Sequence, residues 1–192
     1  MCGRYYIQTD TEELSQIIAE VERRQGNSDV RAAMKVGEVF PTNIVPVISG
    51  NGAELMKWGY SGYKKRVINA RSETAFEKPM FRKSMIERRC LIPASGYYEW
   101  QHTQSGGNRK QKYALYCSGR PIYMAGLWRL EQDEALPVFV ILTRGAGPGI
   151  ADIHDRMPVI LPEPVRKAWI SDSSDVGALM EKAVDEVAFR AI

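Results

Sequence analysis

The stretch CLIPASGYYEW, residues 90–100, is rich in apolar and aromatic residues and predicts one long strand. Successive side chains of a strand point to opposite faces, so Tyr97, Glu99 and Gln101 share one face, and Tyr98 and Trp100 share the other. A carboxyl group flanked by aromatic rings and partly withdrawn from water has a raised pKa and can exchange protons near neutral pH. Glu99 is therefore a candidate for proton transfer. The alternative places it on the wet face of a half-buried strand.

Outward from this stretch, the sequence alternates between short strands and a few helices. Further strands or extended segments are predicted at residues 2–7, 44–48, 54–60, 67–70, 112–117, 122–128 and 137–143. Helices are predicted from the Thr9–Glu13 capping patterns to about residue 24, at 73–88 with Pro79 as break or restart, at 163–170 and at 175–184. Loops are predicted at residues 25–37 and at 103–111, the second of which follows the polar His102. The last segment, residues 187–192, is predicted as either helix or strand. The pattern predicts a β-rich α+β fold, with a curled sheet or barrel at its core and helices around it.

Length and composition set limits on the class of protein. A chain of 192 residues with 44% hydrophobic content is most simply one domain, residues 1–192. The net charge of +3 permits a nucleic-acid partner without requiring one. Three distant cysteines without a CxxC spacing indicate neither a disulfide framework nor a zinc site, so no metal is expected. The absence of a signal peptide or membrane span from the sequence favours a reducing cytoplasmic location, associated with the nucleoid when DNA is bound.

The first five residues, Met1 to Tyr5, carry a specific chemical possibility. Removal of Met1 would leave Cys2 with an α-amine and a thiol on adjacent carbons. The amine can condense with an aldehyde to a Schiff base, and the thiol can then close a thiazolidine ring on the same carbon. The alternative is that Cys2 is only a small residue in a buried first strand.

Two other segments combine polar groups suited to catalysis or phosphate binding. In INARSE, residues 68–73, Asn69 and Arg71 share a face if the segment is extended, or else belong to a solvated turn. In DIHDRMP, residues 152–158, His154 stands between two acids that can orient its ring, and Arg156 follows. The alternative for His154 is a hydrogen-bonded histidine in a turn.

Basic and aromatic residues also recur together along the chain, as they do in proteins that hold single strands by stacking and phosphate contacts. These positions include Arg4 with Tyr5, Trp58 with Gly59, the segment Tyr63–Arg66, Arg71 with Ser72, and Phe81 with Arg82. The alternatives are core packing for Trp58 and a solvated turn for residues 64–66. The sequence contains no Walker A, HExxH, GxSxG or GxGxxG motif, which removes several enzyme classes.

Taken together, these pieces resemble the SRAP (SOS-response-associated peptidase-like) family, from residue 1 to about residue 170. Five motifs in the family's order carry the resemblance: MCGRY at 1–5, KWG at 57–59, INARSET at 68–74, RCLIPA at 89–94 with GYYEW at 96–100, and IHDRMP at 153–158.

The resemblance implies an α+β fold around a barrel-like sheet and a monomer that shields abasic sites in single-stranded DNA without a cofactor. Cys2, exposed by removal of Met1, would form a thiazolidine with the ring-opened sugar, in a pocket lined by Asn69, Glu99 and His154. The implied DNA contacts comprise Arg4, Trp58, Gly59, Tyr63, Arg71, Ser72, Phe81, Arg82 and Arg156.

The sequence departs from the family's pattern in two places. The segment after Gly59, Tyr60–Tyr63, is short and lacks the usual Trp, so Tyr63 is the candidate to wedge the strand. The chain stops at Ile192, before the family's usual Pro-Val-Ser strand, so a piece of the sheet is expected to be absent or replaced. Two other functions use the same residues: an N-terminal-nucleophile hydrolase with Cys2 as nucleophile, and a non-covalent single-strand-binding module.

Overall fold

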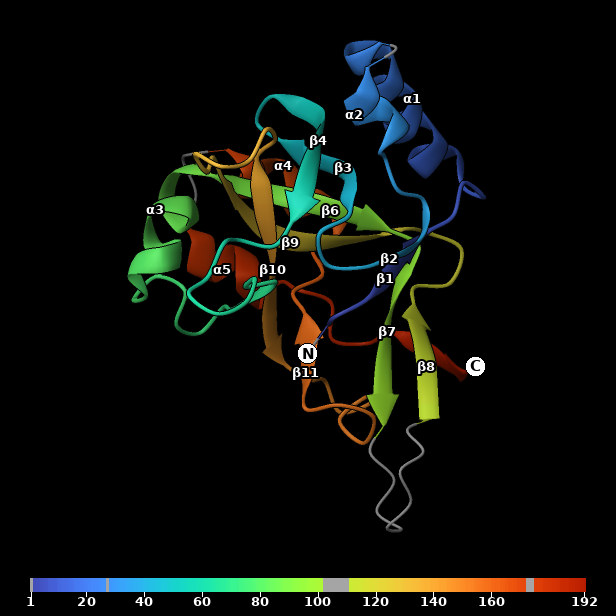
Figure 1. The fold of residues 1–192 in the computed structure, drawn as a ribbon. Coiled ribbons are helices and arrows are strands. Elements are labelled where there is room, and N and C mark those ends of the chain that lie inside the picture. The colour runs from blue at the N-terminus through green and yellow to red at the C-terminus, as the bar shows by residue number, and fades with distance from the viewer. Residues whose placement is uncertain (1, 27, 102–110, 172–174) are drawn as a thin grey trace.

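The computed structural model describes residues 2–26, 28–101, 111–171 and 175–192 (Figure 1). The strands are β1 (Tyr5–Ile7), β2 (Gly37–Val39), β3 (Ile44–Ser49), β4 (Gly52–Trp58), β5 (Asn69–Arg71), β6 (Arg89–Ala94), β7 (Gly96–Gln101), β8 (Gln111–Tyr116), β9 (Ile122–Arg129), β10 (Val138–Gly145), β11 (Arg156–Pro158) and β12 (Ala188–Ala191). The helices are α1 (Glu12–Gln25), α2 (Asp29–Ala32), α3 (Pro79–Glu87), α4 (Glu163–Ile170) and α5 (Val176–Glu181). The predicted mixed α+β fold is confirmed.

The strands form two sheets. A five-stranded sheet has the order β12-β8-β7-β1-β2, and a larger sheet has the order β11-β10-β4-β3-β6-β9, with β5 paired to β10. Because β9 also pairs with β10, the pairings among β10, β4, β3, β6 and β9 return on themselves. Between β3 and β6 the described register consists of Ile48 opposite Leu91, so the larger sheet is ring-like and not a continuous barrel.

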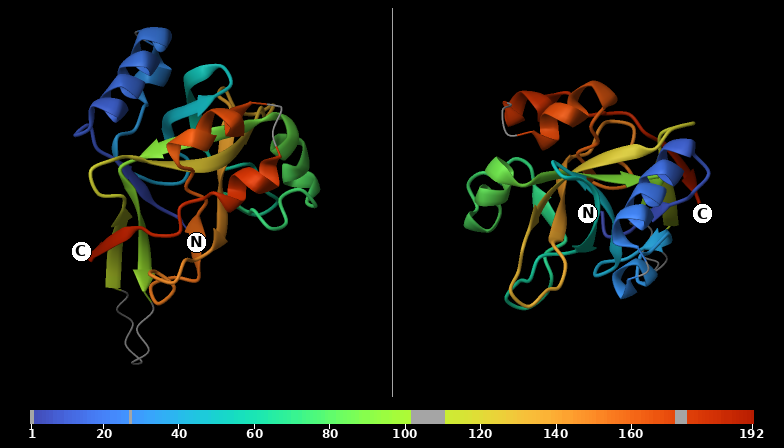
Figure 2. Two further views of the ribbon diagram at one scale, coloured as in Figure 1. Left: turned by 180° about the vertical axis from the view of Figure 1, so that it is seen from behind. Right: turned by 90° about the horizontal axis from the view of Figure 1, so that it is seen from above.

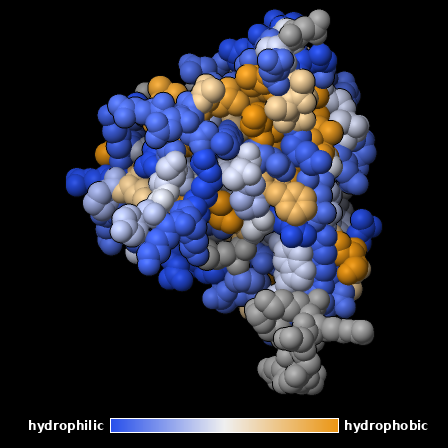
Figure 3. Space-filling model, viewed as in Figure 1, coloured by the Kyte–Doolittle hydropathy of each residue, from blue (hydrophilic) through white to orange (hydrophobic). Residues whose placement is uncertain are grey.

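The helices lie around the sheets (Figures 1 and 2). α1 begins at its cap Thr11, whose hydroxyl accepts from the Leu14 amide, and it places Val21 against Ala53 and Leu55 of β4. Figure 3 shows apolar side chains on the surface near α2, β3 and β4. α4 packs on the ring through Trp169, whose Nε1 donates to the carbonyl of Cys90 at 2.9 Å. Among the described helices, none is long and apolar enough to cross a membrane.

The prediction of one long strand over residues 90–100 is wrong. The chain leaves the larger sheet after Ala94 and enters the smaller sheet at Gly96, so β6 and β7 belong to different sheets. Ser95 turns the chain, since its amide donates to the Tyr6 carbonyl at 2.9 Å and its hydroxyl accepts from the Gln8 amide at 2.8 Å. A Cβ on Gly96 would lie 2.4 Å from the Leu115 carbonyl oxygen, so only glycine fits there. Because of this change of sheet, Glu99 belongs to the five-stranded sheet and not to the larger one.

Several other element boundaries also differ from the prediction. The expected loop 25–37 contains α2, capped by the Ser28 hydroxyl, and the helix expected from residue 73 begins at Pro79, because residues 73–78 form turns. β1 begins at Tyr5 and not at Cys2. β2 and β11 were not predicted, and the last segment, predicted as helix or strand, is the strand β12 beside β8 (Figure 2). His102 and the predicted loop up to residue 110 lie outside the described residues.

Trp58 lies in the core between the two sheets. Its side chain is 0% exposed, its ring lies 5.1 Å from Tyr5 and 6.3 Å from Phe139, and its Nε1 donates to the Ile68 carbonyl at 3.0 Å. The core-packing alternative therefore describes Trp58. The prediction that this side chain contacts DNA does not fit its position.

Replacing Trp58 with Ala should lower the free energy of unfolding by about 3–5 kcal/mol, because a large buried side chain leaves a cavity and an unpaired carbonyl. Urea unfolding followed by circular dichroism measures the change. Tyr63→Ala is the matched control, because Tyr63 is 100% exposed and its loss should change stability by less than about 0.5 kcal/mol. Equal, small effects of both substitutions would contradict the buried position of Trp58.

Candidate active site around Cys2

Cys2 is completely buried where the chain enters β1. Its carbonyl accepts a hydrogen bond from Asn69 Nδ2 at 2.8 Å, and its thiol donates weakly to the Arg4 carbonyl, with Sγ 3.9 Å from the oxygen. Residue 2 is therefore held by its main chain to β5.

Strand pairing explains why segments so far apart in the sequence meet here. β5 lies parallel to β10, with Asn69 opposite Ile141, while β1 lies antiparallel to β7, with Tyr5 opposite Tyr97. Continuing that second register places the residues just before Tyr5 alongside Glu99. The larger sheet thus supplies Asn69, and the smaller sheet supplies Glu99.

Glu99 is buried, with 4% of its surface exposed. Burial raises the pKa of Glu99 to about 7, and the nearby negative charge of Asp155 acts in the same direction. Burial also raises the pKa of the Cys2 thiol well above its ordinary value, and the charge of Glu99 adds to that effect. The site therefore favours a neutral thiol and a carboxyl group that can change its protonation state near neutral pH.

His154 lies beside Glu99, with its Nε2 3.8 Å from Glu99 Oε2. Its Nδ1 accepts a hydrogen bond from the Arg156 amide at 3.0 Å and lies 2.8 Å from Asp155 Oδ1. Because an amide only donates, its contact favours the neutral ring with the proton on Nε2, whereas the Asp155 contact favours a protonated Nδ1. The Asp155 side chain is 83% exposed, so its charge is largely solvated.

A turn after β10 presents His154 to this site. The His154 amide donates to the Ile150 carbonyl at 3.0 Å, and the Ile150 amide donates to the Gly147 carbonyl at 3.1 Å. The Gly/Pro-rich segment before Ile150 ends β10, and β11 then returns against it, with Arg156 opposite Gly145. His154 is therefore a turn histidine, as the alternative stated, and it also lies at the cluster.

Arg156 forms a two-point ion pair with Glu73, with contacts of 2.6 and 2.8 Å, and also donates to the Thr143 carbonyl at 2.7 Å. The guanidinium lowers the pKa of Glu73 to about 2 through these hydrogen bonds. A phosphate group could reach Arg156 only in competition with this carboxylate.

The other residues predicted to contact DNA fall into two groups. Arg71, Arg82 and Tyr63 are exposed, Ser72 is partly exposed, and Arg4 is half-buried. Gly59 and Phe81 are buried like Trp58, so the structure does not place them on a strand-binding surface. Gly59 has a φ of 114°, which side chains other than hydrogen rarely permit, so its backbone conformation explains its presence.

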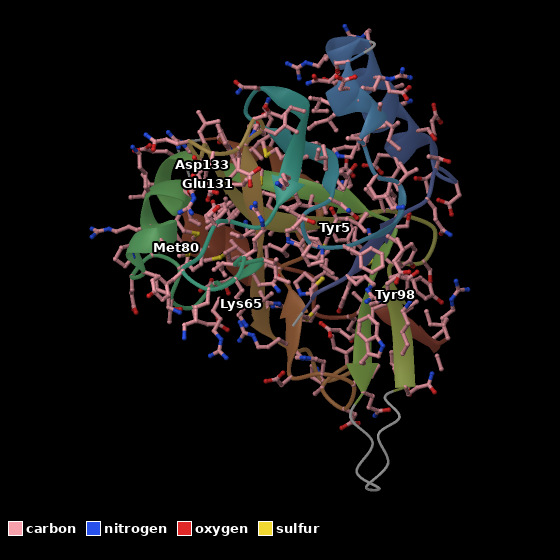
Figure 4. All side chains as sticks on the ribbon, in the orientation of Figure 1. Tyr5, Lys65, Met80, Tyr98, Glu131 and Asp133 are labelled. Carbon is pink, nitrogen blue, oxygen red and sulfur yellow. The ribbon has the colours of Figure 1, made fainter. Side chains whose placement is uncertain are left out.

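Two tyrosines at the site were not predicted as site residues. Tyr5 and Tyr97 are completely buried, and within the described chain neither hydroxyl has a hydrogen-bond partner. Burial raises the pKa of both phenols, with the charge of Cys2 acting in the same direction. Figure 4 shows Tyr5 in the interior and Tyr98 beside β7 and β8. The alternation that places Tyr97 on the face of Glu99 was the signal available in the sequence.

The site thus combines the Cys2 thiol, the Glu99 carboxyl group with its raised pKa and the His154 imidazole, next to the hydrogen bond by which Asn69 holds the main chain of residue 2. In the described residues, no group of three or more His, Cys, Asp or Glu side chains is placed to hold a metal ion.

Comparisons with known proteins agree with the fold. Residues 1–191 match the profile of the SOS response associated peptidase (SRAP) family. The abasic site processing protein YoqW of Bacillus subtilis is 32% identical over 193 residues, which cover 89% of this chain and 80% of that protein. The abasic site processing protein YedK of Escherichia coli is 32% identical over 180 residues, which cover 88% of this chain and 79% of that protein.

Solved structures show the same fold. A crystal structure of a protein from Bacteroides thetaiotaomicron matches with a TM-score of 0.78 at 23% identity, over 100% of this chain and 92% of that one. A phage-related protein from Bordetella bronchiseptica matches with a TM-score of 0.73 at 24% identity, over 100% of this chain and 94% of that one. With the profile match and the two bacterial relatives, these findings show that the chain belongs to the SRAP family.

Proposed function

We propose that this protein processes abasic sites in single-stranded DNA by capturing the damaged sugar on Cys2, after removal of Met1. The observation that carries the proposal is the anchoring of residue 2 by Asn69 beside Glu99, a buried acid with a pKa near 7. The names of the relatives, abasic site processing proteins, support the substrate class. Removal of Met1 would free the Cys2 nitrogen.

The capture proceeds in two bond-forming steps. The Cys2 amine attacks the aldehyde carbon of the ring-opened deoxyribose, and the resulting carbinolamine loses water to give an imine. The Cys2 sulfur then adds to the imine carbon, and the thiol proton is transferred through the Glu99 carboxylate to the nitrogen, which becomes the N–H of the ring. The product is a thiazolidine plus one water, and no oxidant or reductant is needed.

Glu99 moves the protons in this scheme. In its protonated form it donates to the departing hydroxyl of the carbinolamine, and as a carboxylate it accepts the thiol proton during ring closure. A base is required at the second step, because burial keeps the thiol protonated. A pKa near 7 allows both forms of Glu99 to be populated at neutral pH.

Asn69 and His154 complete the site. Asn69 positions the reacting residue through its main-chain carbonyl, so the amine and the thiol stay free of that contact. His154 presents Nε2 toward Glu99 at 3.8 Å and assists proton transfer, including in the reverse reaction that would release the DNA.

Exposed groups would hold the rest of the strand. Arg71, Arg82 and Arg4 provide cations for phosphates, and Tyr63 at the tip of its loop provides a ring that wedges between bases. Ser72 and Arg156 lie close to this surface, the latter after exchange of Glu73 for a phosphate. We expect a monomer that works where single-stranded DNA is exposed, including at the nucleoid.

The test is capture of an oligonucleotide with one abasic site by the purified protein whose Met1 has been removed, verified by mass. Denaturing electrophoresis should show a stable adduct, and its intact mass should equal protein plus DNA minus one water. Binding without an adduct would indicate a non-covalent module. Hydrolysis of peptides in the absence of DNA would instead indicate an N-terminal-nucleophile hydrolase. Either result without adduct formation would reject the proposal.

A further inference from the structure

A row of cations and aromatic rings lies on the face of the five-stranded sheet opposite to the one that carries Glu99. The Arg4 guanidinium lies 4.4 Å from the centre of the Phe40 ring and 4.8 Å from that of Trp100. Lys112 Nζ lies 5.6 Å from the Trp100 ring and 3.9 Å from the Tyr98 ring. We call this face, which also includes Tyr6, the outer ladder.

The ladder continues toward the edge strand β12. The Tyr6 ring stacks on Tyr98 with centres 4.9 Å apart and crosses Gly96, where a Cβ would lie 2.5 Å from the Tyr6 hydroxyl. In register, Tyr98 is opposite Ala114, and Ala114 is opposite Arg190. Because Ala114 is small, the space above it between Tyr98 and Arg190 is not filled by its side chain.

A pocket of about 410 Å³ opens at this end of the ladder. Its lining includes Tyr6, Tyr116, Arg120, Arg190 and the single carboxylate Asp10. The Arg190 guanidinium lies 5.8 Å from the Tyr116 ring centre. We call this the tyrosine–arginine pocket.

The two arginines of this pocket differ from the cations of the ladder in their partners. Arg4 and Lys112 both contact Glu38, at 3.3 and 2.9 Å, so a carboxylate already offsets their charge. Arg120 and Arg190 are exposed, and within the described part of the chain neither forms an ion pair. With two guanidinium groups and one carboxylate in its lining, this pocket has a net positive charge and suits an anion.

We propose that the tyrosine–arginine pocket binds a nucleotide of the single strand beyond the abasic site, with its phosphate between Arg120 and Arg190. The nucleotide's base lies against the half-buried Tyr116 ring, whereas Tyr6, which is 7% exposed and stacked on Tyr98, contributes only to the wall of the pocket. This assignment rests on the proposed function, because it takes single-stranded DNA as the ligand. Guanidinium groups suit phosphate, and aromatic faces accept any base, so this subsite adds affinity without reading sequence.

Arg4 connects this pocket with the capture site. It lies two residues after Cys2, and its guanidinium belongs to the outer ladder. Across the sheet, β7 and β12 are two strand spacings apart, about 10 Å, and along β1 the six residues from Cys2 to Gln8 at the pocket span about 20 Å, so several nucleotides are needed to connect the two sites. Because Cys2 and Glu99 lie on the other face of this sheet, a strand whose damaged sugar lies at Cys2 reaches the pocket by turning around the end of β1 at Arg4 and Trp100.

The test compares the double variant Arg120→Gln/Arg190→Gln with Arg23→Gln/Lys167→Gln, which changes the net charge equally at exposed positions on α1 and α4. The probe is single-stranded DNA with a tetrahydrofuran abasic analogue, which has no aldehyde and cannot be captured. One oligonucleotide has long flanks, and the other ends one nucleotide from the analogue on each side.

The pocket variant should bind the long probe about tenfold more weakly than wild type, with a salt slope smaller by about 0.7 for the one phosphate that is no longer neutralised. The short probe should bind equally well to all proteins, and the control variant should match wild type on both probes. Equal affinity and slope for the long probe, or an equal loss on the short probe, would overturn the assignment. Thermal unfolding verifies that both variants are folded.

The same proteins separate this inference from the capture proposal. With a short aldehyde-containing abasic oligonucleotide, the pocket variant should form the adduct at the wild-type rate. If wild type forms no adduct but the length-dependent loss persists, capture fails and the strand-binding assignment stands. If wild type forms the adduct and no length-dependent loss appears, the assignment alone fails.

Discussion

Replacing Cys2 with Ala should abolish the stable adduct with abasic DNA, lowering its yield at least about 100-fold, since only the Cys2 sulfur can add to the imine carbon and close the ring. The variant keeps the α-amine after Met1 removal and can still form the reversible imine. Borohydride reduction should therefore trap a product that disappears when the reductant is omitted. Denaturing electrophoresis with and without reductant measures both species.

Cys2→Ser is the matched control for this experiment. A hydroxyl has the same position and nearly the same size, but it adds less favourably to an imine, so the serine variant should resemble Ala and not wild type. Non-covalent affinity for the tetrahydrofuran probe should stay within about twofold, because Asn69 binds the main chain of residue 2. A full-strength adduct from either variant would place the covalent bond on another residue and reject the mechanism.

Replacing Glu99 with Gln should slow adduct formation by about 10²- to 10⁴-fold, the usual range for loss of a general acid–base group. The amide preserves shape and burial but can neither donate to the carbinolamine nor accept the thiol proton. Single-turnover kinetics at saturating DNA measures the effect on the chemical step. Glu13→Gln is the control, because Glu13 is a hydrogen-bonded carboxylate on α1, paired with Tyr123 and Arg166.

The pH profile of adduct formation distinguishes a proton-transfer role from a structural one. The reactive amine must be unprotonated, which produces a rising limb governed by an α-amine pKa of about 7.7–8.0. Glu99 must be protonated to expel water, which produces a falling limb governed by its pKa of about 7. Wild type should therefore show a maximum between these values, and Glu99→Gln should lose the falling limb. A Gln variant with an unchanged bell-shaped profile would exclude Glu99 as the acid.

Local patterns predicted those parts of this fold that depend on nearby residues. The cap at Thr11 and the apolar stripe located α1, and the alternation along β7 correctly separated buried Tyr97 and Glu99 from half-buried Tyr98 and Trp100. The break at Ser95 could not be predicted, because both halves of the stretch are apolar and the turn is fixed by contacts with Tyr6 and Gln8. Short α2 was missed because it has only four residues and buries none of them, so it leaves no apolar periodicity in the sequence.

The candidate site shows the same division. Chemical character pointed to Cys2, Glu99 and His154 individually, whereas their meeting depends on strand pairing between distant segments. The ion pair of Arg156 with Glu73 spans 83 positions, so sequence reasoning treated that arginine as free for phosphate. Trp58 illustrates the limit most clearly, since a Trp beside a Gly resembles a stacking residue until its burial is known.

The anchoring of residue 2 through its carbonyl has a consequence for engineering. Asn69 binds a main-chain oxygen, so the position of residue 2 does not depend on the identity of its side chain, while its complete burial limits that side chain to about the size of Cys. The reactive group at position 2 can thus be exchanged while its main chain stays in place. Selenocysteine or a diamino acid of similar size, installed there by semisynthesis, would be held at the same place. Such variants would form adducts with abasic DNA that reverse at different rates.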